Sequence, residues 1–219
     1  MDKLAERGGY RDVFSANGGY LPANGPPLCI MNKMALPLVL ASQSPRRREL
    51  LEILGIPFSI VVSSADERVM PGELPEAYVV RVARAKGLDV ATRVNNSMVL
   101  SADTVVTIDG EILGKPVDRS DAIRMLEKLS GREHAVYTAV CLMDQSTGKM
   151  REGLDRTRVW FAPMTRAQIV GYIDRENVMD KAGAYAIQGF ASVYIPRIEG
   201  SYSNVMGLPL ARVGDLLLR

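Results

Sequence analysis

Residues 36–54 contain the feature that most limits how this chain can fold. A short apolar run, Leu36–Ala41, is followed by the polar segment Ser42–Arg48 and then by regularly spaced leucines. This order predicts a buried strand, a tight turn and a helix over Pro45–Leu54. Pro45 suits the first helical position, because its fixed φ matches a helix and its missing N–H needs no partner there. Ser44 suits the N-cap, where its hydroxyl can accept a backbone N–H.

Three arginines, Arg46, Arg47 and Arg48, stand in the first turn of this predicted helix. Their charge is unfavourable there, because a helix N-terminus already carries partial positive charge. A bound anion removes the conflict, since free N–H groups, hydroxyls and guanidinium groups together make a phosphate site. The alternative is a solvated basic turn. The turn chemistry favours a phosphate site built from Ser42, Arg46 and Arg47, with Arg48 in solvent.

Composition sets the outer limits on function. The chain has 219 residues, 47% of them hydrophobic, which suffices for one large domain or two small lobes. The net charge of +2 implies no general affinity for polyanions. Two cysteines without metal-ligand spacing, and no signal or membrane-spanning pattern, fit a cytoplasmic protein. The single histidine, His134, opens a strand-like run, and we interpret it as structural.

Residues 1–33 differ from the rest of the chain. They are rich in Gly-Gly, Asn-Gly and Pro-Pro pairs without sustained periodicity, which predicts a poorly ordered extension. Residues 34–219 are expected to form a single domain. Because Met31 and Met34 precede the first strand, we hypothesise that the natural start is internal. An intact mass of the native protein that includes residues 1–33 would refute this.

Helical and strand patterns alternate beyond residue 34. The predicted helices lie at 45–54, 75–90, 120–129, 165–174 and 209–217. The predicted strands lie at 36–41, 58–63, 98–102, 134–143, 155–161 and 193–198. Thr165 and Gln168 form a capping-box pattern, and Asp109-Gly110 is a strong hairpin signal. Hairpins beside strand–helix units argue for an α/β fold with a mixed sheet.

Two acidic positions are candidates for chemistry. Asp103 stands among apolar β-formers, where an unpaired carboxylate is expensive to bury. One interpretation is that Asp103 is a metal ligand or a base that activates water. The other is that it is an edge-strand aspartate paired with an arginine, and the motif alone does not distinguish the two interpretations. The pair Asp66-Glu67 follows the second predicted strand. It can supply oxygen ligands to Mg²⁺, although such pairs are equally often solvated loop acids.

Two lysines and one amide are further candidates. Lys86 follows Val79 by seven residues on the apolar face of a predicted helix, so it must extend to solvent or meet an anion. Lys115 lies between Gly114 and Pro116, and it either contacts solvent or a leaving pyrophosphate; no P-loop pattern is present. The amide of Gln188 matches uracil or thymine, or else caps backbone.

These motifs, in this order, resemble the Maf family of nucleotide pyrophosphatases. The resemblance covers residues 35–218, through matches at 40–51, 66–67, 84–86, 102–106, 114–116, 129–131, 138–140, 180–189 and 200–209. It implies a Maf-like catalytic domain over 34–219 with an α/β fold similar to that of inosine triphosphate pyrophosphatases. That fold has a mixed twisted sheet flanked by helices, in two lobes around a central cleft.

The resemblance also implies an activity. Members hydrolyse nucleoside triphosphates to the monophosphate and pyrophosphate with a divalent cation, Mg²⁺ or Mn²⁺. The segment 180–189 resembles the branch that acts on dTTP and UTP, which implies nucleotide-pool house-cleaning. The expected partner is the nucleoside triphosphate, with no nucleic acid or membrane, and the family resemblance suggests a homodimer.

The matching motifs carry roles to individual residues. Asp103 matches the family's proton acceptor, and Arg46, Thr104 and Gln188 match its specificity positions. Our hypothesis assigns the remaining roles as follows: Ser42, Arg46, Arg47, Thr104 and Gln188 bind substrate, Glu67 and Asp103 hold the metal, and Lys86 and Lys115 neutralise the departing pyrophosphate.

Two alternatives stay open. One is a Maf-like pyrophosphatase for other or modified nucleotides, such as 7-methyl-GTP or modified pyrimidines. The other is a non-enzymatic, nucleotide-sensing regulator of cell division. The intact set of acids and lysines argues against the second.

Overall fold

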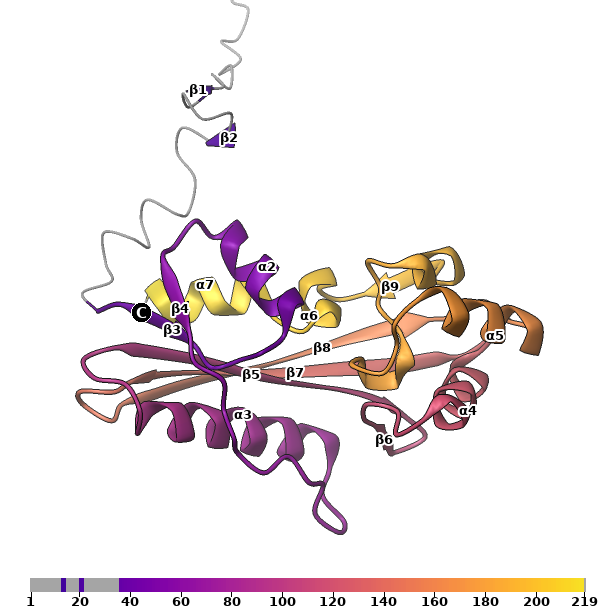
Figure 1. The fold of residues 1–219 in the computed structure, drawn as a ribbon, viewed down its shortest axis with the longest axis horizontal. Helices are drawn as coiled ribbons and strands as arrows, with labels where there is room; N and C mark the ends of the chain where they lie inside the picture. Colours follow the sequence, from indigo (N-terminus) through magenta and orange to yellow (C-terminus); the bar gives the residue numbers. More distant parts are fainter. Residues whose placement is uncertain (1–12, 15–19, 22–35, 219) are drawn as a thin grey trace, which may run out of the picture.

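A mixed sheet is the frame of the molecule (Figure 1). The computed structural model describes residues 13–14, 20–21 and 36–218. Within these residues, seven strands form the main sheet: β3 (Leu38–Leu40), β4 (Phe58–Ile60), β5 (Met98–Ile108), β6 (Glu111–Leu113), β7 (Glu133–Asp144), β8 (Met150–Trp160) and β9 (Arg197–Glu199). A separate antiparallel pair joins β1 (Val13–Phe14) to β2 (Tyr20–Leu21). Otherwise, the extension predicted over 1–33 and the proposed internal start lie outside the described residues.

The strand order is β4-β3-β5-β7-β8-β9, with β6 beside one end of β5. Strand β3 runs parallel to β4 and β5, and the remaining pairs are antiparallel. This mixture follows from the connections, because the β3–β4 and β4–β5 links contain helices whereas β5–β6 and β7–β8 are joined by short turns. The turn at Asp109-Gly110 places both residues at positive φ, as the hairpin signal predicted.

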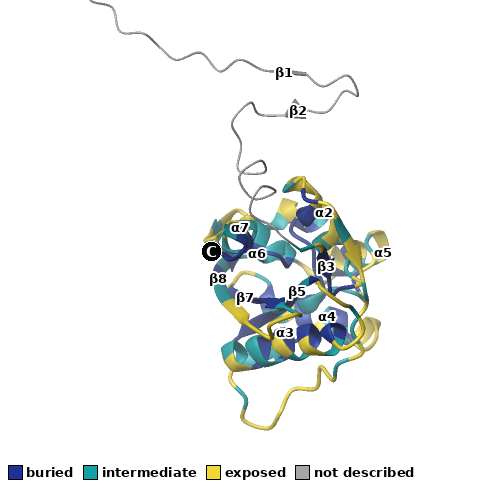
Figure 2. Ribbon diagram, turned by 90° about the vertical axis from the view of Figure 1, so that its left-hand side faces the viewer, coloured by how far each residue is buried: buried dark blue, intermediate teal, exposed yellow. Residues whose placement is uncertain are grey.

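Helices cover both faces of the sheet (Figure 1). Helix α3 (Pro75–Ala91) packs on one face, and α2 (Pro45–Ile53), α6 (Tyr202–Met206) and α7 (Leu210–Leu218) lie on the other. Helices α4 (Arg119–Leu129) and α5 (Arg166–Arg175) lie at the far end, near the 3₁₀ helices η1 (Ala182–Ala184) and η2 (Phe190–Tyr194). Strands β5 and β7 are therefore buried along almost their whole length (Figure 2).

The apolar core is divided along the sheet. One cluster joins α2 and α7 to β3, β5 and β7, and includes Leu51, Leu100 and Leu216. Another joins α4, α5 and the 3₁₀ helices to the opposite end of β5, and includes Leu126 and Tyr172. Two further clusters pack α3 against β3, β5 and β7, and the two-lobed arrangement stays a prediction.

The predicted α/β class with a mixed sheet flanked by helices is confirmed. The capping box is also present, since Thr165 and Gln168 exchange hydrogen bonds between side chain and backbone. The strand predicted at 98–102 continues through Asp103 to Ile108. The strand predicted at 193–198 is wrong over its first part, which is the end of η2. A helical turn brings the Phe190 and Tyr194 rings to 6.1 Å and onto the core, and this packing overrides β-propensity.

Candidate active site

A gap in the sheet creates a pocket. Strand β3 ends at Leu40, and β6 begins to pair with β5 at Val106. Between these points, at residues 101–105, β5 pairs with β7 on one side, and no described strand pairs with it on the other side. A pocket of about 670 Å³ opens at this stretch, between the β3–α2 turn, the β4–α3 loop, α3 and the segment 177–188. Ligands in open α/β sheets bind at such carboxyl-end crevices.

All the predicted site residues line this pocket. They come from six separate parts of the chain: Ser42, Arg46, Arg47, Glu67, Lys86, Asp103, Thr104, Lys115 and Gln188. The fold therefore brings together the residues that the sequence motifs predict as site residues.

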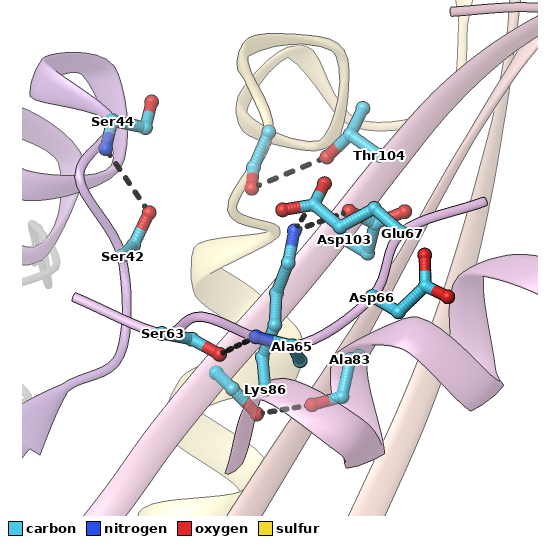
Figure 3. Close-up of polar contacts among 12 residues, drawn as sticks. Ser42, Ser44, Ser63, Ala65, Asp66, Glu67, Ala83, Lys86, Asp103 and Thr104 are labelled. Atoms are coloured by element: carbon cyan, nitrogen blue, oxygen red, sulfur yellow. Dashed lines mark hydrogen bonds and ion pairs between the residues drawn. The ribbon is translucent and has the colours of Figure 1, made fainter. Parts of the chain in front are cut away.

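Lys86 joins the two predicted acids (Figure 3). Its Nζ lies 2.8 Å from Asp103 Oδ1 and 2.9 Å from Glu67 Oε2. The Lys86 side chain is 10% exposed and that of Asp103 is 7% exposed, whereas that of Glu67 is 46% exposed. The sequence predicts that Lys86, on the apolar face of α3, either extends to solvent or meets an anion. The structure shows the second outcome. The partner of Asp103 is this lysine and not an arginine.

Asp103 keeps one oxygen free of protein partners. Its Oδ2 is buried and accepts no hydrogen bond from the described residues. Burial raises the pKa of the Asp103 carboxyl, and the positive charges of Lys86 and Arg47 oppose this shift. An unpartnered buried oxygen is costly, so this atom is well suited to accept a proton or to bind a ligand in the pocket.

The neighbouring acids Asp66 and Glu67 diverge. Asp66 points away from Lys86 (Figure 3) and forms an ion pair of 2.6 Å with Arg68. Hydrogen bonds from Arg68 lower the pKa of Asp66 to about 2. Only Glu67 faces the pocket, so the pair is one site residue and one solvated loop acid.

Arg47 is turned inward from the first turn of α2. Its Nε donates to the Gly207 carbonyl at 2.8 Å, and its Nη2 donates to Thr104 Oγ1 at 3.1 Å. Both partners are neutral, and burial lowers the pKa of this guanidinium. Gly207 has a φ of 108°, which favours glycine and turns its carbonyl toward Arg47. The described residues therefore leave a partly buried positive charge without an ion pair beside the pocket.

Arg46 and Arg48 differ from Arg47. Arg46 pairs with Asp180 at 2.8 Å and so links α2 to the segment 177–188. Arg48 is exposed and pairs with Glu52, as expected of a solvent residue. Ser44 is the N-cap, but the prediction that its hydroxyl caps the helix is wrong. Its own N–H instead donates to Ser42 Oγ, because the preceding turn brings that hydroxyl close.

The remaining predicted residues are less constrained. Thr104 Oγ1 lies 3.0 Å from Thr138 Oγ1 and also accepts from Arg47. Lys115 and Gln188 are exposed at the pocket and form no hydrogen bond or ion pair with the rest of the described chain. Their side chains are free to contact a ligand.

The structure also adds residues that the sequence reasoning passed over. Asp180 and Lys181 belong to the segment 180–189, and their side chains pair with each other at 2.7 Å. Tyr78 lines the pocket and donates to the Glu67 carbonyl at 2.7 Å. Its position beside Val79 on the apolar face of α3 is typical of a buried core residue, and this pattern does not indicate a role at a site.

An α/β fold with a cleft of acids, lysines and arginines beside a helix N-terminus is that of a phosphate-handling protein. The family described as Maf-like protein matches residues 37–219, and this chain belongs to the Maf family. None of the described helices combines the length and hydropathy that crossing a membrane requires.

Several relatives are similar over most of their length. The "dTTP/UTP pyrophosphatase" of Anaeromyxobacter dehalogenans is 50% identical over 85% of this chain and 95% of its own. The protein of that name from Syntrophomonas wolfei is 47% identical over 82% of this chain and 95% of its own. A solved dITP/XTP pyrophosphatase of Mycobacterium abscessus is 16% identical, with a TM-score of 0.37 over 59% of this chain and 76% of its own.

Proposed function

We propose that this chain hydrolyses dTTP and UTP to the nucleoside monophosphate and pyrophosphate. The observation that carries the proposal is the cluster of Asp103, Lys86 and Glu67, which lines the same pocket as the partly buried charge of Arg47. The similarity to proteins named dTTP/UTP pyrophosphatase supports it. A role in nucleotide-pool house-cleaning and a cytoplasmic, homodimeric state belong to the same proposal.

Arg47 and the turn before α2 supply the triphosphate site. A phosphate oxygen beside Arg47 would give this partly buried guanidinium the anion that its neutral partners do not provide. Ser42 and the first N–H groups of α2 add donors at the same helix end. Arg46 joins them when it exchanges Asp180 for phosphate.

Glu67 and Asp103 fit a divalent cation bound together with substrate. Among the described residues, no three His, Cys, Asp or Glu side chains converge on one point. Mg²⁺ is usually held by one or two carboxylates with substrate phosphates and waters, and the unpartnered Asp103 Oδ2 offers such a ligand. Mg²⁺ or Mn²⁺ held by these two residues supplies charge neutralisation at the phosphates.

Asp103 serves as the base. A water oxygen bonds to the α-phosphorus, its proton passes to the Asp103 carboxylate, and the bond from the α-phosphorus to the oxygen bridging to the β-phosphorus breaks. The pyrophosphate leaves with that oxygen. Lys86, predicted to neutralise the departing pyrophosphate, is instead held between two acids, and we assign it the role of fixing both carboxylates in place. Lys115, which is unpaired within the described chain, neutralises the leaving group.

Thr104 and Gln188 orient the base of the nucleotide. Thr138 Oγ1 donates to the Asn204 carbonyl, so the proton between the two threonines comes from Thr104. Because Arg47 Nη2 also donates to the Thr104 oxygen, one lone pair of that oxygen remains to accept from a ligand. Gln188 offers both a donor and an acceptor, which matches the N3–H and a carbonyl of uracil or thymine.

Pyrophosphate release from a panel of triphosphates with Mg²⁺ tests the function, with Asp103→Asn as the control. We expect release from dTTP and UTP and almost none from the variant. Preferential release from 7-methyl-GTP or a modified pyrimidine triphosphate would replace the proposed specificity. No release from any triphosphate would contradict the enzyme and favour a nucleotide sensor.

A further inference from the structure

The segment that carries Glu67 has no regular structure of its own. Residues 61–74 connect β4 to α3 as an extended, largely exposed loop, and they hang beyond the sheet in Figure 2. A carboxylate on such a loop is placed by the few contacts that hold the backbone near it. These contacts therefore decide whether Glu67 reaches the pocket.

Helix α3 supplies these contacts. Asp89 accepts from Ser63 Oγ and from the Ser64 N–H at the start of the loop. Arg81 donates to the Arg68 carbonyl at 2.9 Å. Neither contact is made by Glu67 itself.

Tyr78 is the α3 residue that holds the backbone of Glu67. Its hydroxyl donates to the Glu67 carbonyl at 2.7 Å, and the same helix supplies Lys86, which binds the Glu67 carboxylate at 2.9 Å. Glu67 is thus held at both ends by one helix. We propose that Tyr78 is a positioning residue, which sets Glu67 within reach of Lys86 and Asp103.

The Tyr78 hydroxyl is suited to this role and not to proton transfer. The side chain is 7% exposed and packs in the cluster of Val79, Val82, Val105 and Tyr137. The phenol hydroxyl has a single proton to donate. That proton is committed to a carbonyl oxygen, which can only accept.

Tyr78→Phe isolates the contact, because the ring and its packing remain and one hydrogen bond is lost. Tyr137→Phe is a matched control, since Tyr137 is 8% exposed in the same cluster but does not line the pocket. Amide hydrogen exchange of the metal-free protein should be faster over 64–70 in Tyr78→Phe and unchanged there in Tyr137→Phe. Equal exchange over 64–70 in both variants would overturn the proposal.

A kinetic arm rests on the proposed function. In Tyr78→Phe we expect the Mg²⁺ concentration for half-maximal dTTP hydrolysis to rise about 3- to 10-fold, the usual scale for one hydrogen bond. In a Glu67→Gln background the same substitution should have no further effect, because Tyr78 acts through Glu67. An equal loss in both backgrounds would indicate a purely structural role and contradict positioning. If the unmodified protein releases no pyrophosphate, the function fails, and the exchange experiment alone decides about Tyr78.

Discussion

Asp103 and Glu67 share one lysine but are held in opposite ways. Asp103 stands within a long central strand, in register with Ala139 of β7, and its side chain is 7% exposed. Glu67 stands on a loop, and its side chain is 46% exposed. Asp103, the proposed base, is thus fixed by the sheet, whereas Glu67 is placed by a few contacts with α3. Catalytic groups are often divided in this way between a rigid scaffold and the loops around it.

The largest effect is expected at the rigid acid. Asp103→Asn removes the proposed proton acceptor and keeps the shape of the side chain, so turnover should fall by about 10²- to 10⁴-fold. The thermal midpoint should change little, because Lys86 keeps Glu67 as a partner. Turnover is measured by pyrophosphate release, and near-normal turnover would refute the base role.

Lys86 tests whether the buried acid needs its partner. Lys86→Met leaves the Asp103 carboxylate buried without an ion pair, so the free energy of unfolding should fall by about 3–5 kcal/mol. Urea denaturation at neutral pH measures this. Adding Asp103→Asn should restore part of the loss, because the uncompensated charge is then gone. A Lys86→Met variant as stable as the unmodified protein would mean that the pair is not formed as described.

The loop acid should separate activity from stability. Glu67→Gln is expected to slow turnover by about 10²-fold, the scale of one electrostatic contact in a transition state. The free energy of unfolding should change by less than about 1 kcal/mol, because Glu67 is half exposed. Parallel kinetics and denaturation check both parts. A large loss of stability in Glu67→Gln would contradict the proposed difference between Glu67, held on a loop, and Asp103, held in the sheet.

The smallest expected effect is on the free energy of unfolding and concerns His134, which is buried in the sheet on β7 beside β5. Its Nε2 lies 2.8 Å from the Tyr185 hydroxyl, and burial lowers the pKa of His134 from 6.5 to about 3. The unfolded chain therefore takes up a proton below pH 6.5 that the folded chain does not, and stability is lost as pH falls toward 3. Between pH 7.5 and 5.5 the loss should be about 1.4 kcal/mol.

The single histidine makes that measurement clean. Denaturation of His134→Gln at both pH values is the control, and its stability should be nearly the same at each. An equal pH dependence in the variant would assign the loss to other groups.

Local rules explain what could be predicted from the sequence. The start of α2 at Pro45, the Thr165 capping box and the apolar-face position of Lys86 depend on residues within about two helical turns. Such patterns are set by backbone geometry and are visible in the chain itself.

Contacts between distant residues set the rest. Arg46 meets Asp180, 134 positions away, and no local pattern signals that pair. Asp66 and Glu67 are adjacent and chemically alike, so only the path of the loop decides which one faces Lys86. The roles of Tyr78 and of η2 likewise follow from tertiary packing.

Hydrolysis in ¹⁸O-labelled water tests the central claim most directly. If a water activated by Asp103 attacks the α-phosphorus of dTTP, mass spectrometry should find one label in the monophosphate and none in the pyrophosphate. Label in the pyrophosphate, or release of single phosphates, would contradict the mechanism.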